Sequence, residues 1–581
     1  MVNTSALALA ASVAANPDKT LRVARSWDYP KRFIWLIVGC IALLSIVNFV
    51  SLAWRYFTRG RSYSSPARHA VSITRIPAAA VDTIQALAFR WTIPVGTSFS
   101  INFLEFGVCV SYVAALLSWT FANTTSVGGL KFDAHYYANR AGTIAASQLP
   151  ILAGLGMRNN IIALVTGISF DKLNLLHRTA ARALCLLVWI HAGGRISLGL
   201  TGDEMIAQNQ WVQCGALAIS SLTLLCLLSV RPIRNWSYEF FLIIHFIFVF
   251  IILLALYFHT RGRDITYWGI WPTMVIWGTD RFISLLRISI FNFSYLNPFS
   301  SKQSKSVLDA SIEVLSPLFL RVSFKRPTYF QWRAGQSAFI YFPTISALPW
   351  ESHPFTISSL PKAKAQGSNE VVFLLRVHRG ITARLLKEAA AEKTYPVFIN
   401  GPYSNPPVLI GYNTVMLIAG GSGISFVLPL FEYLTSTSQS SIGRPQRIFL
   451  VWAIRDAGHA QWLTPVIQNI SKDLSVSVKI FVTSGKTAVS AESSAGASLN
   501  DEKMDEPGLH DQPFVSVDHG RPNITTLVEG EVEKSRGRMC INVCGPTGLI
   551  EATREAVRRP RPMDILRGGP TITFHVEGFG G

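Results

Sequence analysis

The sequence predicts a multi-domain protein in which an α-helical transmembrane bundle of about seven spans precedes a small antiparallel β-barrel and an α/β domain. Three observations carry this prediction. Apolar runs of spanning length are confined to the first half of the 581-residue chain. Short alternating apolar runs follow from about 310, and from about 412 buried strands alternate with helical stretches. A chain of this length is also too long for one ordinary domain.

Seven apolar runs are long enough to cross a bilayer, which takes about 20 residues. They cover 33–54, 98–121, 143–167, 176–199, 211–230, 237–259 and 265–287. The third run is the weakest, because Gln148, Arg158, Asn159 and Asn160 interrupt it, so six or eight spans are the alternatives. Residues 1–32 are predicted to form an N-terminal tail and residues 33–290 one transmembrane domain.

The net charge of +19 reflects membrane topology rather than nucleic-acid binding. Short links rich in arginine lie on the cytoplasmic side of a membrane. This places the N-terminal tail outside and everything after the last span in the cytoplasm. Asn123 then begins a glycosylation acceptor in an external loop. The arginines are Arg55, Arg59, Arg61, Arg68, Arg75 and Arg90 in the first link, and Arg231 and Arg234 in a second.

Two histidine pairs with the same spacing lie inside the apolar runs. Thirteen residues separate His177 from His191, and thirteen separate His245 from His259. A step of fourteen residues along a helix is four turns less about 40°. The two histidines of a pair therefore lie on the same helix face, roughly 21 Å apart along the axis. Ionisable residues in a membrane mark functional sites. Packed side by side, the helices would set His177 opposite His245 and His191 opposite His259. This predicts two bis-histidine haem sites, with hydrogen-bonded core histidines as the alternative.

The second half divides into two predicted domains after a polar linker. Residues 305–410 hold runs typical of an antiparallel barrel at 310–316, 318–324, 337–342 and 371–378, followed by a helical piece at 382–392. Residues 411–581 hold runs typical of buried parallel strands at 414–420, 447–454, 477–483 and 538–545. Residues 487–518, rich in Ser, Ala, Gly and acids, are predicted to be a disordered insertion.

Three motifs in these domains resemble those of a known superfamily. HPFTISS at 353–359, which follows Trp332, Gly335 and Gln336, looks like the flavin-binding barrel of the ferredoxin–NADP reductase superfamily. GGSGIS at 420–425 and CGP at 544–546 look like its NADP-binding domain. With the two histidine pairs, roughly residues 90–581 are similar to fungal plasma-membrane ferric reductases, relatives of the NADPH oxidases. The resemblance implies FAD, NADPH and two b-type haems as cofactors.

The HPFTISS motif has side chains that suit a flavin. Phe355 and Thr356 can supply a flat wall and a hydroxyl, and His353 can reach the ribityl or phosphate side. Backbone N–H groups between Gly380 and Thr382 open a helix and could hold the pyrophosphate. Pro354, Ile357 and Ser359 complete this set, and a plain proline-containing turn is the alternative.

The glycine turn after 414–420 lets the backbone approach a dinucleotide pyrophosphate, whose charge the next helix N-terminus favours. A plain strand-to-helix turn is the alternative. By the resemblance, Cys544 faces the nicotinamide. Lys486 and Arg521 are candidates for the 2′-phosphate, with solvated surface charges as the alternative. The contact candidates are Gly420, Gly421, Ser422, Gly423, Ile424, Gly545 and Pro546.

The end of the sequence departs from the family pattern. These reductases usually finish with an aromatic residue stacked on the flavin, whereas this sequence finishes Phe579-Gly580-Gly581. We predict that Phe579 takes the stacking role, because the glycines beside it let the backbone bend. An open flavin face is the alternative.

The predicted function is a transmembrane metalloreductase. NADPH yields two electrons as a hydride, a bis-histidine haem accepts one, and FAD bridges the mismatch. The acceptors are extracellular Fe(III) chelates, with Cu(II) as a second candidate, in a metal-uptake system with a ferroxidase or permease. Nucleic acid is not a partner. A superoxide-generating NADPH oxidase is the alternative enzyme, and a non-catalytic haem-binding membrane protein is the alternative of another class.

Overall fold

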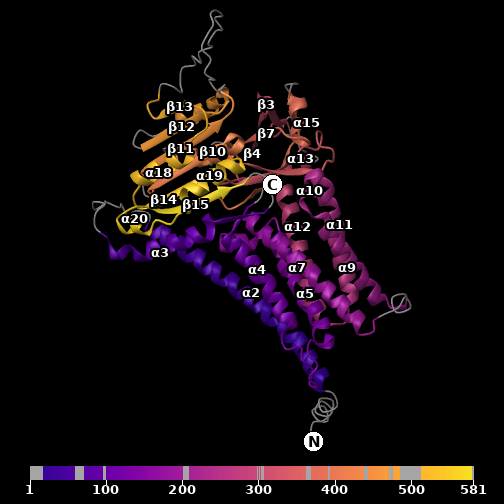
Figure 1. The fold of residues 1–581 in the computed structure, drawn as a ribbon. Coiled ribbons are helices and arrows are strands. Elements are labelled where there is room, and N and C mark those ends of the chain that lie inside the picture. The colour runs from indigo at the N-terminus through magenta and orange to yellow at the C-terminus, as the bar shows by residue number, and fades with distance from the viewer. Residues whose placement is uncertain are drawn as a thin grey trace, which may run out of the picture. The chain divides into compact units, whose positions relative to one another are not determined.

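A computed structural model describes most of the chain, which forms two compact units (Figure 1). The first unit contains Met1–Val50 and Glu105–Leu286, and the second contains Ser51–Leu104 and Arg287–Gly581. Residues 51–104 therefore belong to the second unit, whereas the sequence predicts one domain over 33–290. The described residues are 17–58, 71–95, 100–200, 208–297, 299, 301, 306–361, 368–389, 393–436, 443–468, 470, 475–484 and 512–578.

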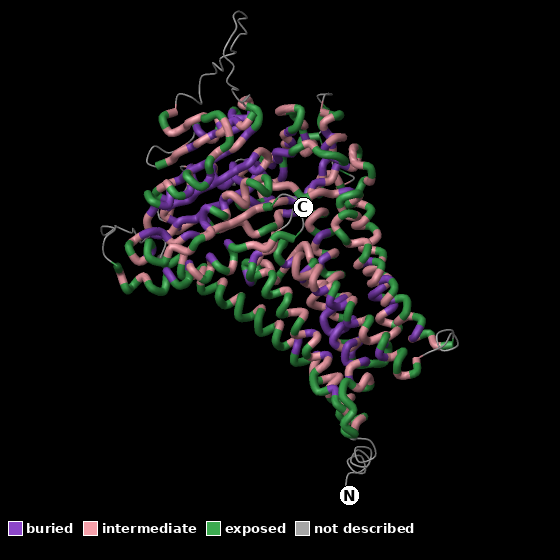
Figure 2. The backbone as a smooth tube through the Cα atoms, viewed as in Figure 1, coloured by how far each residue is buried: buried purple, intermediate pink, exposed green. Residues whose placement is uncertain are grey.

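Long apolar helices build the first unit. α5 packs along α7, α9 packs along α11, and α7 contacts α9. Leu116, Ile144 and Leu187 lie in its interior, whereas Leu43 and Phe49 of the first helix are exposed. Much of the first helix is drawn green, and so exposed, in Figure 2. Such an apolar exterior suits hydrocarbon. The helices are α2 (Pro17–Thr58), α4 (Phe103–Phe121), α5 (Ala134–Gly156), α6 (Ile161–Thr166), α7 (Phe170–Ser197), α9 (Gln210–Leu228), α10 (Arg231–Trp236), α11 (Tyr238–Thr260), η3 (Thr266–Ile270) and α12 (Trp271–Phe291).

A long helix lies at or near each of the seven predicted spans. In the described part of the chain, five helices are long and apolar enough to cross a membrane, namely α2, α4, α7, α9 and α11. The count of seven stays a prediction. The bounds predicted for the third span, 143–167, are wrong. α5 begins at Ala134, where the Asp133 side chain caps it, and ends at Gly156. A separate short helix, α6, then begins at Ile161, and the Asn160 side chain caps its N-terminus.

Two antiparallel sheets form the barrel of the second unit. Their orders are β7-β4-β3-β8 and β6-β5-β9, and a bridge between Ile357 and Phe373 joins them. The HPFTISS motif was expected after a strand, but it begins inside β6, because its first residues pair with β5. The elements are α13 (Phe293–Leu296), β3 (Ala310–Ser316), β4 (Phe319–Pro327), β5 (Ser337–Tyr341), β6 (Ser352–Thr356), β7 (Ser368–Arg376), α15 (Ile381–Glu388), β8 (Thr394–Tyr395) and β9 (Phe398–Tyr403).

A parallel six-stranded sheet follows, in the order β13-β12-β11-β10-β14-β15. Its central strands β11, β10 and β14 are mostly buried and drawn purple in Figure 2, whereas the edge strands β13 and β15 are mostly half-buried. The strand order reverses between β10 and β14, and ligands bind at such a switch point in open α/β sheets. The elements are β10 (Thr414–Gly420), η6 (Gly421–Gly423), α16 (Ile424–Thr435), β11 (Arg447–Ile454), η7 (Ala457–Leu463), α17 (Thr464–Ile467), β12 (Ser475–Val482), β13 (Val515–His519), α18 (Ile524–Lys534), β14 (Arg538–Cys544), α19 (Thr547–Arg558), α20 (Pro562–Leu566) and β15 (Thr571–Glu577).

Three parts of the second unit differ from the prediction or were missed. The predicted insertion at 487–518 runs too far, because β13 pairs with β12 from Val515 onward; its residues 487–511 lie outside the described residues. β15 was not predicted. The link after α2 also folds, into η1 (Ile73–Arg75), α3 (Ile76–Gln85), η2 (Ala86–Arg90) and a hairpin of β1 (Thr92–Pro94) and β2 (Ser100–Asn102).

Candidate functional site

The histidines of the first unit meet at two levels between α7 and α11. The ring centres of His177 and His245 lie 6.4 Å apart, and those of His191 and His259 lie 6.3 Å apart. A metal ion bonded on both sides to imidazole nitrogens at about 2 Å needs ring centres roughly 6 Å apart. Each pair is therefore spaced to hold one metal ion between its rings.

Hydrogen bonds orient three of the four rings. His177 Nδ1 lies 2.9 Å from the Leu152 carbonyl oxygen, and His191 Nδ1 lies 2.8 Å from that of Ala138. His259 Nδ1 lies 2.7 Å from the Trp211 carbonyl oxygen. A carbonyl only accepts, so Nδ1 carries the proton and Nε2 keeps its lone pair for a metal.

Glycines make room for these rings, and sequence reasoning missed them. A Cβ on Gly142 would lie 2.8 Å from His191 Nδ1, one on Gly156 3.0 Å from the His177 ring, and one on Gly215 2.7 Å from His259 Nδ1. Each glycine stands four residues after the carbonyl that its histidine contacts, where a side chain would cover that carbonyl. Gly142 and Gly156 are also fourteen positions apart, which matches the histidine step and could have revealed them.

The fourth position of this pattern is different. One fourteen-residue step beyond Trp211 and Gly215 on α9 come Leu225 and Ser229. The Ser229 hydroxyl donates to the Leu225 carbonyl at 2.5 Å. His245 Nδ1 is buried and has no hydrogen-bond partner among the described residues. The pair of His177 and His245 therefore has one oriented ring, whereas the other pair has two.

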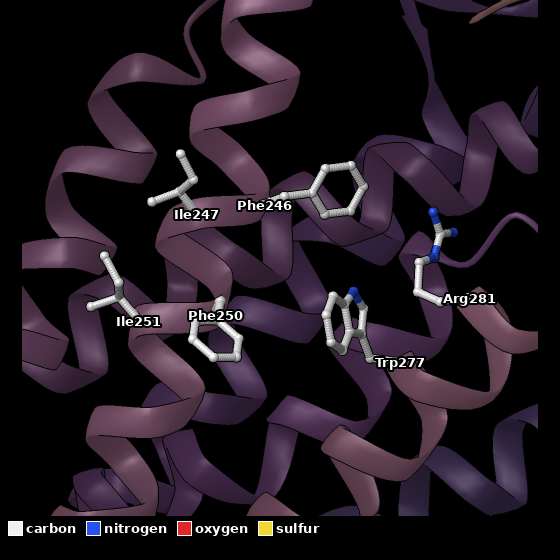
Figure 3. A pocket seen from close by; sticks show the side chains of 6 residues that line it. All are labelled: Phe246, Ile247, Phe250, Ile251, Trp277 and Arg281. Atoms are coloured by element: carbon white, nitrogen blue, oxygen red, sulfur yellow. The ribbon is translucent and has the colours of Figure 1, made fainter. Parts of the chain in front are cut away.

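A groove of about 520 Å³ lies between α11 and α12 (Figure 3). Phe246, Ile247, Phe250 and Ile251 line it from α11, and Trp277 and Arg281 line it from α12. On a helix these α11 residues lie on average about 170° from His245. The groove is thus on the opposite side of α11 from the histidine pairs and is not part of them.

A buried carboxylate holds the flavin motif in the second unit, and sequence reasoning missed it. Glu351 accepts from Arg384 of α15 at 2.9 Å through each oxygen, and its Oε1 lies 3.0 Å from His353 Nε2. Burial alone would raise the pKa of Glu351, but the contacts with His353 and Arg384 lower it, so the carboxylate stays charged. It ties β6 to α15, whose first turn is the candidate pyrophosphate site.

The other predicted flavin residues have mixed surroundings. Phe355 and Thr356 are half-buried, and Pro354 is exposed. Gly380 precedes α15 with a φ of 77°, which favours glycine. The structure uses several other groups internally. Ile357 is buried in the barrel, the Ser359 hydroxyl bonds to the backbone of β7, and Thr382 Oγ1 accepts from the His378 N–H at 2.8 Å.

The glycine turn after β10 and the turn after β14 touch at the switch point. A Cβ on Gly423 would lie 2.0 Å from the Cys544 carbonyl oxygen, and one on Gly420 would lie 2.6 Å from Pro546 Cδ. A Cβ on Gly545 would lie 2.9 Å from the Gly420 nitrogen. These glycines let two backbones meet where a dinucleotide binds in such sheets.

The barrel and the sheet are linked beside this turn. The Ser358 hydroxyl donates to the Ser425 carbonyl at 3.2 Å, and so connects HPFTISS with GGSGIS. Trp452 donates to the Gly421 carbonyl at 3.2 Å, and Ser425 donates to that of Ser422 at 3.0 Å. Ile424 is buried at the start of α16. The two predicted motifs are therefore neighbours, and Ser358 is a contact that sequence reasoning missed.

The remaining predicted site residues are Cys544, Arg521, Lys486 and Phe579. Cys544 is buried at the end of β14, and this burial raises the pKa of its thiol, so the thiol stays protonated. Arg521 is exposed after β13, three strands away from β10. Lys486 and Phe579 lie outside the described residues, and their roles stay predictions.

Replacing Gly423 with alanine is expected to abolish NADPH-driven flavin reduction in the full-length chain. Its φ of −57° suits alanine, so the crowding against Cys544 is the main penalty, and overpacking typically costs about 1–3 kcal/mol. Stopped-flow absorbance and thermal unfolding measure the effects. Gly548→Ala is the matched control, because its Cβ would meet nothing within 4 Å. Wild-type flavin reduction in Gly423→Ala would contradict the assignment of this turn.

Three protein families match successive parts of the chain. The family described as ferric reductase like transmembrane component matches residues 141–256. This range includes His177, His191 and His245 but not His259. The FAD-binding domain family matches residues 304–407. The ferric reductase NAD binding domain family matches residues 412–558. The matches follow the bundle, barrel and parallel sheet in order.

Curated relatives come from fungi. Ferric reductase transmembrane component 3 of Saccharomyces cerevisiae is 26% identical over 73% of this chain and 58% of its own length. Ferric/cupric reductase transmembrane component 2 of the same yeast is 25% identical, covering 72% and 58%. A probable cell surface ferric reductase of Aspergillus oryzae is 27% identical, covering 56% and 44%. The chain thus spans less than two thirds of the length of these relatives. Its three domain matches and its relatives together support a fungal ferric reductase of the transmembrane-component type.

Proposed function

We propose that this chain is an NADPH-dependent ferric-chelate reductase that moves electrons across a membrane. The observation that carries the proposal is the pair of histidine sites at two levels of one helical bundle, joined in one chain to flavin-type and nucleotide-type domains. A nucleotide module alone would serve many reductases, but stacked histidine sites suit passage of electrons through a bilayer.

The residues fit the cofactors that the family implies. His177 with His245, and His191 with His259, would each hold one haem, which supplies one-electron redox chemistry. His353, Phe355 and the first turn of α15 would hold FAD, which accepts a hydride and releases single electrons. Gly420–Gly423 and Gly545 would hold NADPH. Because each iron would be held by a histidine from both helices, an external acceptor would be reduced without binding to the metal.

The direction of transfer follows from the arginine-rich links. They favour a cytoplasmic nucleotide module, an external N-terminus and an acceptor outside the plasma membrane. Fe(III) chelates are the proposed substrate. Cu(II) is a second one, since a relative of this chain is named a ferric/cupric reductase. The product Fe(II) would pass to an uptake system.

The experiment reconstitutes the full-length chain with FAD and haem and supplies NADPH with a ferric chelate. We expect Fe(II), trapped by a colorimetric chelator, to form faster than superoxide, detected as dismutase-sensitive cytochrome c reduction. A His177→Ala variant separates transfer through the bundle from leakage at the flavin. Superoxide as the main product would favour the oxidase alternative. Absence of haem and of turnover would favour the non-catalytic alternative.

A further inference from the structure

The link between α2 and α4 folds onto the edge of the parallel sheet. α3 lies beside α20, and it also contacts β15 (Figure 1). β15 is an outer strand of this sheet, so among the described residues no strand pairs with one side of its backbone. Exposed strand edges are ready to pair and are usually covered.

Two charged side chains cover this edge. Asp82 and Arg90 are 3% and 2% exposed, and they form an ion pair of 2.8 Å. Arg90 also donates to the carbonyls of Ile572 at 2.6 Å and Val557 at 3.1 Å. The Ile572 N–H donates to Asp82 at 2.9 Å. Together the pair satisfies both backbone groups of Ile572, as a further strand would.

Weaker contacts surround this pair on the same face. Arg75 donates to the Ile565 carbonyl at 2.9 Å, and Ser100 donates to Glu551 at 2.9 Å. The Arg558 guanidinium lies 5.5 Å from the ring centre of Trp91. The link is thus held at α3, at η2 and at the hairpin, and it leads directly into α4.

A buried ion pair is a poor source of stability, because desolvation offsets its attraction. Its best-attested role is to fix one arrangement, since any shift leaves buried charges unpaired. Asp82 and Arg90 bond to the N–H and the C=O of the same residue of β15, Ile572, so they specify register between the link and the sheet. An apolar contact of equal area would tolerate sliding.

We propose that Asp82 and Arg90 are positioning residues for electron transfer. They hold the nucleotide-binding domain to the link that joins two membrane helices. The Ser358–Ser425 hydrogen bond ties that domain to the barrel that is proposed to hold FAD, so the pair fixes where electrons leave the flavin. The inference rests on the proposed function, in which NADPH donates a hydride to FAD and FAD passes single electrons to haem iron. The pair acts on the second transfer and not on the first.

The test uses the full-length chain loaded with FAD and haem. Stopped-flow absorbance follows flavin reduction and haem reduction by NADPH in wild type, Arg90→Gln and Asp82→Asn. Arg559→Gln is the matched control, because Arg559 is exposed at the end of α19. We expect both pair variants to reduce flavin within about twofold of wild type but haem about tenfold more slowly, the scale of a small misplacement. Arg559→Gln should match wild type in both steps.

Two results would overturn the proposal. Unchanged haem reduction in both pair variants would show that the pair does not position the domain. A parallel loss of flavin reduction and haem reduction would show that the pair only supports the structure of the sheet.

Hydrogen exchange gives a second, haem-independent readout. Amides at 76–90 and 571–577 should lose protection together in Arg90→Gln, and in Arg90→Lys if that variant alone folds. If wild type shows no haem reduction, the proposed function fails, while the exchange result still decides whether the pair fixes the link.

Discussion

The variant His177→Ala is expected to lose one haem and to keep the other. His177 faces His245 with ring centres 6.4 Å apart, and the second pair lies a fourteen-residue step away on each helix. Since that step separates the levels by roughly 21 Å, losing one ligand leaves the other pair intact. Haem extraction should therefore fall from two per chain to one, and ferric-chelate reduction should be abolished, because each electron must use both levels.

The same loss should follow from His245→Ala, and His191→Ala and His259→Ala should remove the other haem. Low-spin absorbance and haem-to-protein ratio measure the outcome. His135→Ala is the control, because its side chain is 53% exposed near the start of α5 and it is not one of the four paired histidines. Two haems retained in His177→Ala would refute the pairing, and so would none in wild type.

Alanine at Gly142, Gly156 or Gly215 should remove haem although every ligand is still present. A Cβ on Gly142 or Gly215 would lie 2.7–2.8 Å from a histidine ring, closer than real contacts allow, and one on Gly156 would lie 3.0 Å away, tighter than nearly all real contacts. The ring must move away, and its hydrogen bond to the helix carbonyl breaks. Losing such an outer-shell partner typically costs 10–100-fold in metal affinity. Gly156→Ala should affect the level of His177, and the other two variants the level of His191.

Gly193→Ala and Gly278→Ala are the matched controls for this series. They lie in α7 and α12, and a Cβ there would meet nothing within 4 Å. Alanine is a better helix former than glycine by about 1 kcal/mol, so these variants should be slightly more stable and keep both haems. Whether a Gly→Ala substitution stabilises the helix or removes haem thus depends on which side chain the added Cβ meets. Equal haem content in all five variants would mean that the glycines do not shape the sites.

The sequence predicts the architecture because its periodicities are strong. Apolar length separates the helical half from the rest, and the histidine step places four side chains in facing pairs. The strands at 310–316, 414–420 and 447–454 are found where they were expected. Each of these signals is local, so one segment contains all the information that is needed.

The missed features depend on contacts between distant segments. Arg90 is one of many arginines in its link, and only its 482-residue separation from Ile572 along the chain reveals a buried partner. Glu351 becomes recognisable through Arg384, which lies on another element. The short β13 was absorbed into the polar stretch before it, because Val515–His519 has few large apolar residues. These features depend on contacts between segments that are distant in the sequence, so the local residue pattern could not predict them.

The unequal treatment of the four imidazoles has an electrochemical consequence. An imidazole whose N–H is hydrogen-bonded is a stronger electron donor to its metal, and stronger donors stabilise the oxidised ion. Both His191 and His259 bond to backbone carbonyls. The corresponding carbonyl for His245 is that of Leu225, and it accepts a hydrogen bond from Ser229 instead. Iron held by His177 and His245 should therefore have the higher reduction potential. The two levels would then form a step rather than a pair of equal sites. In the proposed direction of transfer, an electron would have to be driven from the iron at His177 and His245 to the iron at His191 and His259.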